Sequence, residues 1–244
     1  MQSVPVWDFP TRVFHWALAV AVIASYLTGE EEGIWFVVHT VSGYTVALLL
    51  VFRLVWGFAG SVHSRFSDFT YSPGSVKTYA KQLLRFNPPR FVGHNPLGGW
   101  MVFLMLVALA GTVVTGLFSG EDDGGAGILL PLIAAPGGEG LAEVHEFFAN
   151  AVVALAGIHV LAVFLDWFLT KENLVKAMIT GRKDLDDTEV GNQKPLVGRW
   201  RGVVAAFIVA ALGAVLIQQT DFAAIASGGA ESEHHSERDE PNDD

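Results

Sequence analysis

Four histidines lie in or at the ends of apolar segments, where an ionisable side chain is rare and costly. They are His15, His39, His145 and His159. Two neutral imidazoles, one on each side of a flat macrocycle, can hold a haem iron and leave it no open position, so that it only transfers electrons. The 244-residue chain has no Cys, which excludes thiolate zinc sites, iron–sulfur clusters and covalent haem attachment. The expected cofactor is therefore non-covalent haem b.

The depth of these histidines sorts them into two pairs. His15 and His159 each lie about 20 Å below the outer end of their segment, at 1.5 Å per residue, whereas His39 and His145 lie at outer ends. His145 and His159 are separated by close to four helical turns and so leave the same helix face. We expect two haem b groups in one bundle, held by the pairs His15/His159 and His39/His145. The alternatives are that the histidines are structural or that they bind zinc. Two histidines at each depth would supply only half of the four ligands that zinc takes in a tetrahedral site.

The composition points to a membrane protein rather than an ordinary soluble enzyme. The chain is 51% hydrophobic and only 16% charged, and several stretches approach the roughly 20 apolar residues that span a bilayer. The predicted spans are residues 13–28, 34–58, 97–119, 144–169 and 203–217. The expected fold is all-α: a four-helix haem-binding domain over residues 1–183, a linker and fifth transmembrane helix over 184–220, and a disordered acidic tail over 221–244.

Basic and acidic residues fall on opposite sides of these spans. All but Arg238 of the 15 Lys and Arg residues lie on the side that holds the N-terminus and the 59–96 and 170–202 connections. The positive-inside rule then places the N-terminus in the cytoplasm and the tail in the periplasm of a bacterial inner membrane. The net charge of −10 argues against nucleic acid. The acidic outer face is either a solvated surface or a docking surface for a basic redox protein.

Further residues carry weaker expectations. Arg12 and Arg53 lie at inner ends of spans and could pair with haem propionates or anchor lipid headgroups. His63 and His94 are expected at the surface, with proton exchange at a quinone pocket as the alternative. Residues 75–86 could form a basic amphipathic helix on the membrane surface, and residues 120–140 an irregular outer loop. An aromatic belt is expected from Trp7, Trp16, Trp35, Trp56, Trp100 and Trp167.

The chain resembles the bacterial cytochrome b561 and nickel–iron hydrogenase b-type subunit family. The resemblance rests on VWDFPTRVFHW (6–16), HTVSGYTVALLLVFRLVWGF (39–58), GHNPLGGWM (93–101), LAEVHEFFANAVVALAGIH (141–159) and NLVKAMITGRK (173–183). It implies a four-helix bundle with two haem b groups, whose ligands by position are His15, His39, His145 and His159. The fifth segment and the tail lie beyond this core.

The resemblance also implies the function. Members of this family pass electrons between the membrane quinone pool and a protein partner, which can be a periplasmic dehydrogenase, a hydrogenase or a c-type cytochrome. We expect a stand-alone or cytochrome-partnered electron carrier, with a hydrogenase or dehydrogenase membrane anchor as the alternative. A proton-coupled transporter and a structural scaffold with incidental histidines are the remaining rivals. The fifth segment could pack against a second copy, another subunit or lipid.

Overall fold

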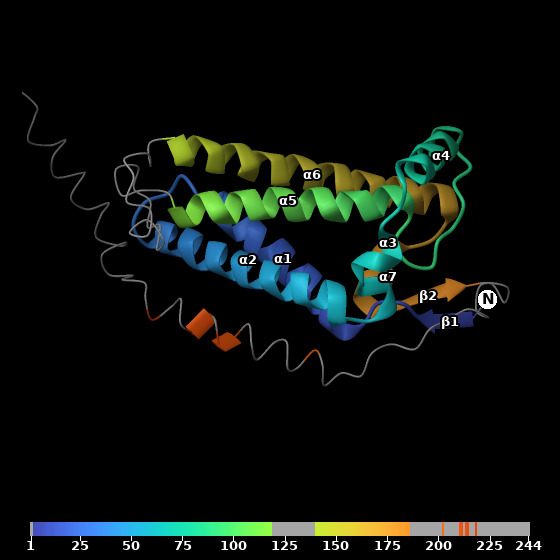
Figure 1. Cartoon of the computed structure of the whole chain (residues 1–244), viewed down its shortest axis with the longest axis horizontal. Coiled ribbons are helices and arrows are strands. Elements are labelled where there is room, and N and C mark those ends of the chain that lie inside the picture. The colour runs from blue at the N-terminus through green and yellow to red at the C-terminus, as the bar shows by residue number, and fades with distance from the viewer. Residues whose placement is uncertain are drawn as a thin grey trace, which may run out of the picture.

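The computed structural model describes residues 2–118 and 140–185, together with the helical positions Gly202, Ala210, Ala211, Gly213, Ala214 and Gln218. Within these residues, four helices are long and apolar enough to cross a membrane. They lie alongside one another as a bundle, and the short helices and strands gather at one end of it (Figure 1). The all-α membrane fold is therefore confirmed. The predicted outer loop over 120–139, most of the fifth span and the acidic tail lie outside the described residues.

The first spanning helix, α1 (Phe9–Leu27), begins at Phe9 rather than at residue 13. Asp8 caps it, because Asp8 Oδ1 accepts a hydrogen bond of 2.8 Å from the backbone N–H of Thr11. Pro10 lies in the first turn, where its missing N–H has no intrahelical acceptor to lose. A polar residue followed by proline thus starts the helix before its apolar run begins.

The other spanning helices are α2 (Ile34–Ala59), α5 (Pro96–Phe118) and α6 (Leu141–Thr170). All three agree with the predicted spans to within a few residues. α5 and α6 pack along each other, as do α1 and α2, and α2 also contacts α5. The cluster of buried residues between them contains Ala21, Val46, Leu50, Ala108, Leu109 and Val152. Small and β-branched side chains at these contacts let the helix backbones approach closely.

The connection between α2 and α5 folds over the end of the bundle where α2 ends and α5 begins. We call this the inner end and the opposite end the outer end. It contains the 3-10 helix η1 (Val62–Ser64), α3 (Phe66–Phe69) and α4 (Pro73–Leu84). The expected amphipathic helix is present as α4, which starts two residues early because the Ser72 hydroxyl accepts a hydrogen bond from the Ser75 N–H.

Two short strands join the ends of the bundle domain. β1 (Gln2–Pro5) pairs antiparallel with β2 (Arg182–Leu185), so that Gln2 lies opposite Leu185. α6 ends at Thr170 and is followed by Lys171, which takes a left-handed conformation with φ of 63°. The helix α7 (Leu174–Thr180) then leads into β2. The sequence analysis did not predict this sheet, because four-residue strands far apart in the chain leave no periodic signal.

The expected aromatic belt is wrong for two of its members. Trp56 is only 2% exposed and packs with Phe14 and Phe52, and its indole N–H donates to Asp8 Oδ2 at 3.1 Å. Trp7 is 7% exposed and packs with Val6 and Ala177. Both are buried because the inner connection and the sheet cover the bundle end. Trp16, Trp35, Trp100 and Trp167 are exposed.

Candidate functional site

His15 on α1 and His159 on α6 face each other across the bundle. Their ring centroids are 6.4 Å apart, with an angle of 55° between the ring planes. His15 Nδ1 is buried and has no hydrogen-bond partner within the described residues. This pair lies deep in the bundle, as the spacing predicted.

His39 on α2 and His145 on α6 face each other at the outer end, with ring centroids 6.1 Å apart and planes at 74°. The Nδ1 of His39 lies 2.8 Å from the carbonyl oxygen of Ser25, and the Nδ1 of His145 lies 2.8 Å from that of Thr112. A carbonyl only accepts, so each Nδ1 must carry the proton. The lone pair of both rings is then at Nε2, which is the form that binds a metal ion.

A glycine makes each of these carbonyls reachable. Gly29 follows Ser25 by one helical turn, and a Cβ at Gly29 would lie 3.4 Å from His39 Cε1. Gly116 follows Thr112 by the same interval, and a Cβ there would lie 2.8 Å from His145 Cε1, closer than non-bonded carbons approach. The sequence signal for each of these sites is therefore a glycine four residues after the accepting carbonyl, which the sequence analysis did not single out.

The two pairs fit the axial positions of a haem. A histidine nitrogen binds a transition metal at about 2.0 Å, so two rings that face one ion on a common axis have centroids about 6 Å apart. Both measured separations, 6.4 Å and 6.1 Å, match this value. No group of three or more His, Asp or Glu that could hold a metal ion occurs in the described part of the chain. A zinc site with three or four protein ligands is therefore not formed there.

The two arginines differ in how fully they are engaged. Arg53 is 5% exposed, donates from Nη1 to the Ser64 carbonyl at 2.9 Å and lies over the Phe66 ring at 4.8 Å. Arg12 donates from Nη1 to the Ile179 carbonyl, but its buried Nε has no hydrogen-bond partner in the described residues. Arg12 thus keeps a free donor, whereas Arg53 fastens the inner connection to α2.

His63 and His94 are not both surface residues. His63 Nδ1 lies 2.9 Å from Asp68 Oδ2. His94 packs against Trp7 and Phe69, with ring centroids 4.9 Å and 4.5 Å apart, and its Nδ1 is buried without a hydrogen-bond partner in the described residues. Burial, together with the charges of Arg53 and Lys183, lowers the pKa of His94 to about 3. The surface expectation is therefore wrong for His94, because the folded inner connection encloses it.

Asp166 is a buried carboxyl group that the sequence analysis did not single out. It is 9% exposed and accepts a hydrogen bond of 3.2 Å from the Tyr79 hydroxyl. It lies seven residues after His159, a spacing that returns to the same helix face and could have been noticed.

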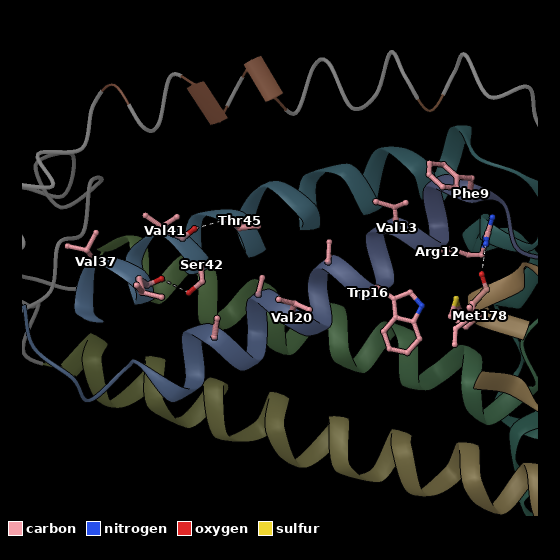
Figure 2. A pocket seen from close by; sticks show the side chains of 15 residues that line it. Phe9, Arg12, Val13, Trp16, Val20, Val37, Val41, Ser42, Thr45 and Met178 are labelled. Atoms are coloured by element: carbon pink, nitrogen blue, oxygen red, sulfur yellow. Dashed lines mark hydrogen bonds between the residues drawn. The ribbon is translucent and has the colours of Figure 1, made fainter. Parts of the chain in front are cut away.

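A groove of about 880 Å³ runs along α1 and α2 (Figure 2). Its lining is apolar apart from Arg12, Ser42 and Thr45, and none of the four paired histidines lines it. The groove is therefore separate from the space between either histidine pair.

Four membrane-spanning helices, paired imidazoles and the absence of cysteine are the features of a membrane-bound b-type cytochrome. The chain belongs to the prokaryotic cytochrome b561 family, whose model matches residues 6–181. Haem b and electron transport are properties of this family.

Curated relatives cover most of the chain at low identity. The protein from Rhizobium leguminosarum bv. viciae is 23% identical over 77% of this chain and 92% of its own length. Those from Rhodobacter capsulatus and Azotobacter vinelandii are 24% and 25% identical, over 77% and 76% of this chain and 84% and 90% of their own lengths. All three are named "Probable Ni/Fe-hydrogenase B-type cytochrome subunit". No solved structure matches the chain.

Proposed function

We propose that the chain holds two haem b groups, one between His15 and His159 and one between His39 and His145, and carries electrons across the membrane. The observation that supports this most directly is the presence of two facing imidazole pairs, with centroids 6.4 Å and 6.1 Å apart, at two levels of one bundle. When bound, haem b supplies a one-electron Fe(III)/Fe(II) couple.

The protein residues hold and orient this couple. The two histidines of each pair would hold a haem iron from opposite sides, which would leave no site for oxygen or substrate and would restrict the chemistry to electron transfer. The hydrogen bonds from Nδ1 of His39 and His145 to carbonyl oxygens fix the ring orientation and increase the basicity of Nε2. We assign the free Nε of Arg12 to a propionate of the deep haem, as guanidinium groups recognise carboxylates.

The electron path is proposed to connect the quinone pool with a periplasmic redox protein. Basic residues cluster at the inner end, which the positive-inside rule assigns to the cytoplasm, and Glu30, Glu31 and Glu32 are exposed at the outer end. A basic c-type cytochrome would be attracted to this acidic outer surface. We also propose that the haem-binding domain ends at residue 183 and that the fifth transmembrane segment ends at residue 220.

A membrane anchor for a hydrogenase is the second candidate function. It is favoured by the names of the relatives, which align with about three quarters of this chain. The anchor role predicts stoichiometric co-purification with a large catalytic subunit, whereas the cytochrome-partnered role predicts a chain that is isolated alone or as a homodimer.

The test is haem quantification in the detergent-purified chain. A reduced-minus-oxidised spectrum with pyridine haemochrome analysis is expected to give two haem b groups per chain. His39→Ala and His159→Ala should each lose one, and His63→Ala, which removes an imidazole outside both pairs, should keep two. Two haem groups retained in either ligand variant would contradict the assigned pairs, and no haem in the wild type would contradict the proposed function.

A further inference from the structure

The face of α6 that presents the two histidines continues to a buried carboxyl group. Steps of seven residues, each close to two turns, place four side chains on this face; in order from the outer end they are His145, Val152, His159 and Asp166. Val152 is 4% exposed and Asp166 is 9% exposed, and the two histidines are partly buried. Asp166 lies about 10 Å from His159 along the helix axis.

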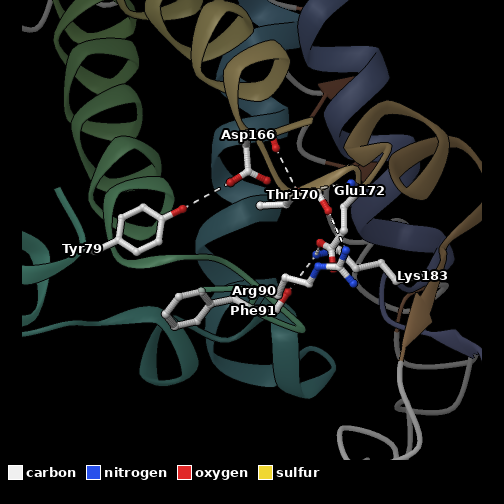
Figure 3. Close-up of polar contacts among 7 residues, drawn as sticks. All are labelled: Tyr79, Arg90, Phe91, Asp166, Thr170, Glu172 and Lys183. Atoms are coloured by element: carbon white, nitrogen blue, oxygen red, sulfur yellow. Dashed lines mark hydrogen bonds and ion pairs between the residues drawn. The ribbon is translucent and has the colours of Figure 1, made fainter. Parts of the chain in front are cut away.

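Polar side chains from several elements gather around Asp166 (Figure 3). The Tyr79 hydroxyl of α4 donates to Asp166 Oδ1 at 3.2 Å. Both residues line a cavity of about 30 Å³ together with Arg90, Glu172 and Lys183. A cavity of this size has room for about one water molecule. α5, which packs along α6, contributes no titratable side chain.

The charged groups around this cavity form ion pairs with one another, and none of these ion pairs includes Asp166. Lys183 Nζ lies 3.4 Å from Glu172 Oε2, and Arg90 Nε lies 3.9 Å from Glu172 Oε1. Arg90 also donates to the Thr170 carbonyl at 2.6 Å and Lys183 to the Phe91 carbonyl at 2.9 Å. In the described part of the chain, Asp166 forms no ion pair within 4 Å. Its side chain accepts from the phenol of Tyr79 and also interacts with the Thr170 hydroxyl and with the charge of Lys183.

A buried carboxyl group that forms no direct ion pair is sensitive to any charge that changes nearby. Burial disfavours the ionised form, and an added negative charge disfavours it further. Interactions between charges are also stronger in a protein interior than in water. Burial and the neighbouring Asp166 raise the pKa of Tyr79, so the phenol stays protonated and serves only as a donor.

We propose that Asp166 takes up one proton from the cytoplasmic side when the haem held by His15 and His159 is reduced, and releases it on reoxidation. The haem that His15 and His159 would hold would supply a one-electron Fe(III)/Fe(II) couple, with its electron from the quinone pool or the redox partner. One proton from water converts the Asp166 carboxylate to the carboxylic acid. Glu172, whose Oε1 is buried in the same cavity and accepts no hydrogen bond there, is the second carboxylate on the proton route. This inference rests on the haem assignment proposed above.

The first test is a redox titration of the purified full-length chain at several pH values. The midpoint potential of the deep haem should fall as pH rises, with a limiting slope of about 59 mV per pH unit for one proton per electron. Asp166→Asn keeps the oxygen that faces Tyr79 and should remove this slope. Asp184→Asn, the same change in a carboxylate of β2, should leave the slope unchanged. A slope that persists in Asp166→Asn with full haem content overturns the inference.

A second readout does not depend on a folded variant. An infrared difference spectrum between reduced and oxidised wild-type protein should contain a carboxylic acid C=O band that appears on reduction and shifts when Asp is labelled with ¹³C at its carboxyl carbon. Tyr79→Phe should move this band without removing it, because the phenol donor is lost. The absence of a labelled band overturns the inference. Retention of both haem groups in His159→Ala would instead show that the haem assignment itself is wrong.

Discussion

At the scale of single residues, each outer histidine depends on a backbone carbonyl and a glycine. The carbonyls of Ser25 and Thr112 orient the rings of His39 and His145. Four residues after each carbonyl, Gly29 (just beyond the end of α1) and Gly116 (in α5) leave space for the ring to approach. Sequence spacing locates the histidines, but the acceptor of each Nδ1 proton belongs to a neighbouring helix.

Gly116→Ala should weaken haem binding at the outer level. The new Cβ would lie 2.8 Å from His145 Cε1, so the ring must move away from the Thr112 carbonyl. Loss of such a supporting hydrogen bond typically lowers metal affinity about 10- to 100-fold. Haem titration of the apoprotein measures the change. Gly157→Ala, where a Cβ meets nothing within 4 Å, is the matched control. Equal haem affinity in both variants would contradict this role of Gly116.

His94 should make the inner end of the protein sensitive to acid. Burial lowers its pKa to about 3 in the folded protein, against about 6.5 for a free imidazole. Between these values the unfolded chain binds a proton that the folded chain does not, so stability falls as pH is lowered from 6.5 towards 3. The limiting slope is about 1.4 kcal/mol per pH unit for one proton.

The measurement is denaturant unfolding in detergent at pH 6.5 and pH 4.5, followed by tryptophan fluorescence. His94→Gln should lose less stability between these pH values than the wild type. His63→Gln removes an imidazole from the same end and is the control. An identical loss in wild type and His94→Gln would show that His94 is not held neutral.

At the scale of elements, capping residues and long-range contacts decide where the helices begin and what covers their ends. Hydropathy predicted all four described spans, but it placed the start of α1 at residue 13 because Phe9–Arg12 is not uniformly apolar. The β1–β2 sheet and the burial of Trp56 depend on segments that are distant in sequence. Short strands with no alternation carry no local signal for such pairing.

Asp8→Ala should destabilise the packing of α1 against α2. It removes the helix cap, which is typically worth about 1 kcal/mol, and leaves the buried Trp56 N–H without its acceptor, which costs about 1–3 kcal/mol. A loss of about 2–4 kcal/mol is expected in denaturant unfolding. Asp8→Asn retains an acceptor oxygen and should lose less. Asp184→Ala, at an exposed position on β2, is the control. If Asp8→Ala lowered the free energy of unfolding by less than this control does, the capping role would be contradicted.

At the scale of the whole molecule, the bundle separates two charged surfaces and places the histidine pairs between them. The described inner elements carry the basic residues, and the exposed Glu30, Glu31 and Glu32 lie between α1 and α2 at the opposite end (Figure 1). The electrostatic field of such a charged surface accelerates the association of an oppositely charged partner, and salt screens this field.

Replacing Glu30, Glu31 and Glu32 together with Gln should slow electron transfer to a basic c-type cytochrome. We expect about a tenfold lower second-order rate at low ionic strength, and little difference at 1 M salt, where the screening length is about 3 Å. Stopped-flow absorbance measures the rate. Asp184→Asn, on the inner side, should leave it unchanged. A rate that is independent of both salt and these substitutions would indicate a partner that docks elsewhere.

The amino-acid sequence by itself determined the membrane class, the four described spans, the four paired histidines and the family. The membrane class, the spans and the pairing of the histidines depend on local composition and helical periodicity, which neighbouring residues encode directly. The family follows from the resemblance of the motifs within residues 6–183. The tertiary structure decided which carbonyls orient His39 and His145, why Gly116 must lack a side chain, how His94 becomes buried and which groups surround Asp166. Each of these depends on groups from different helices or on the inner connection. Only the folded chain brings such groups within hydrogen-bonding or packing distance.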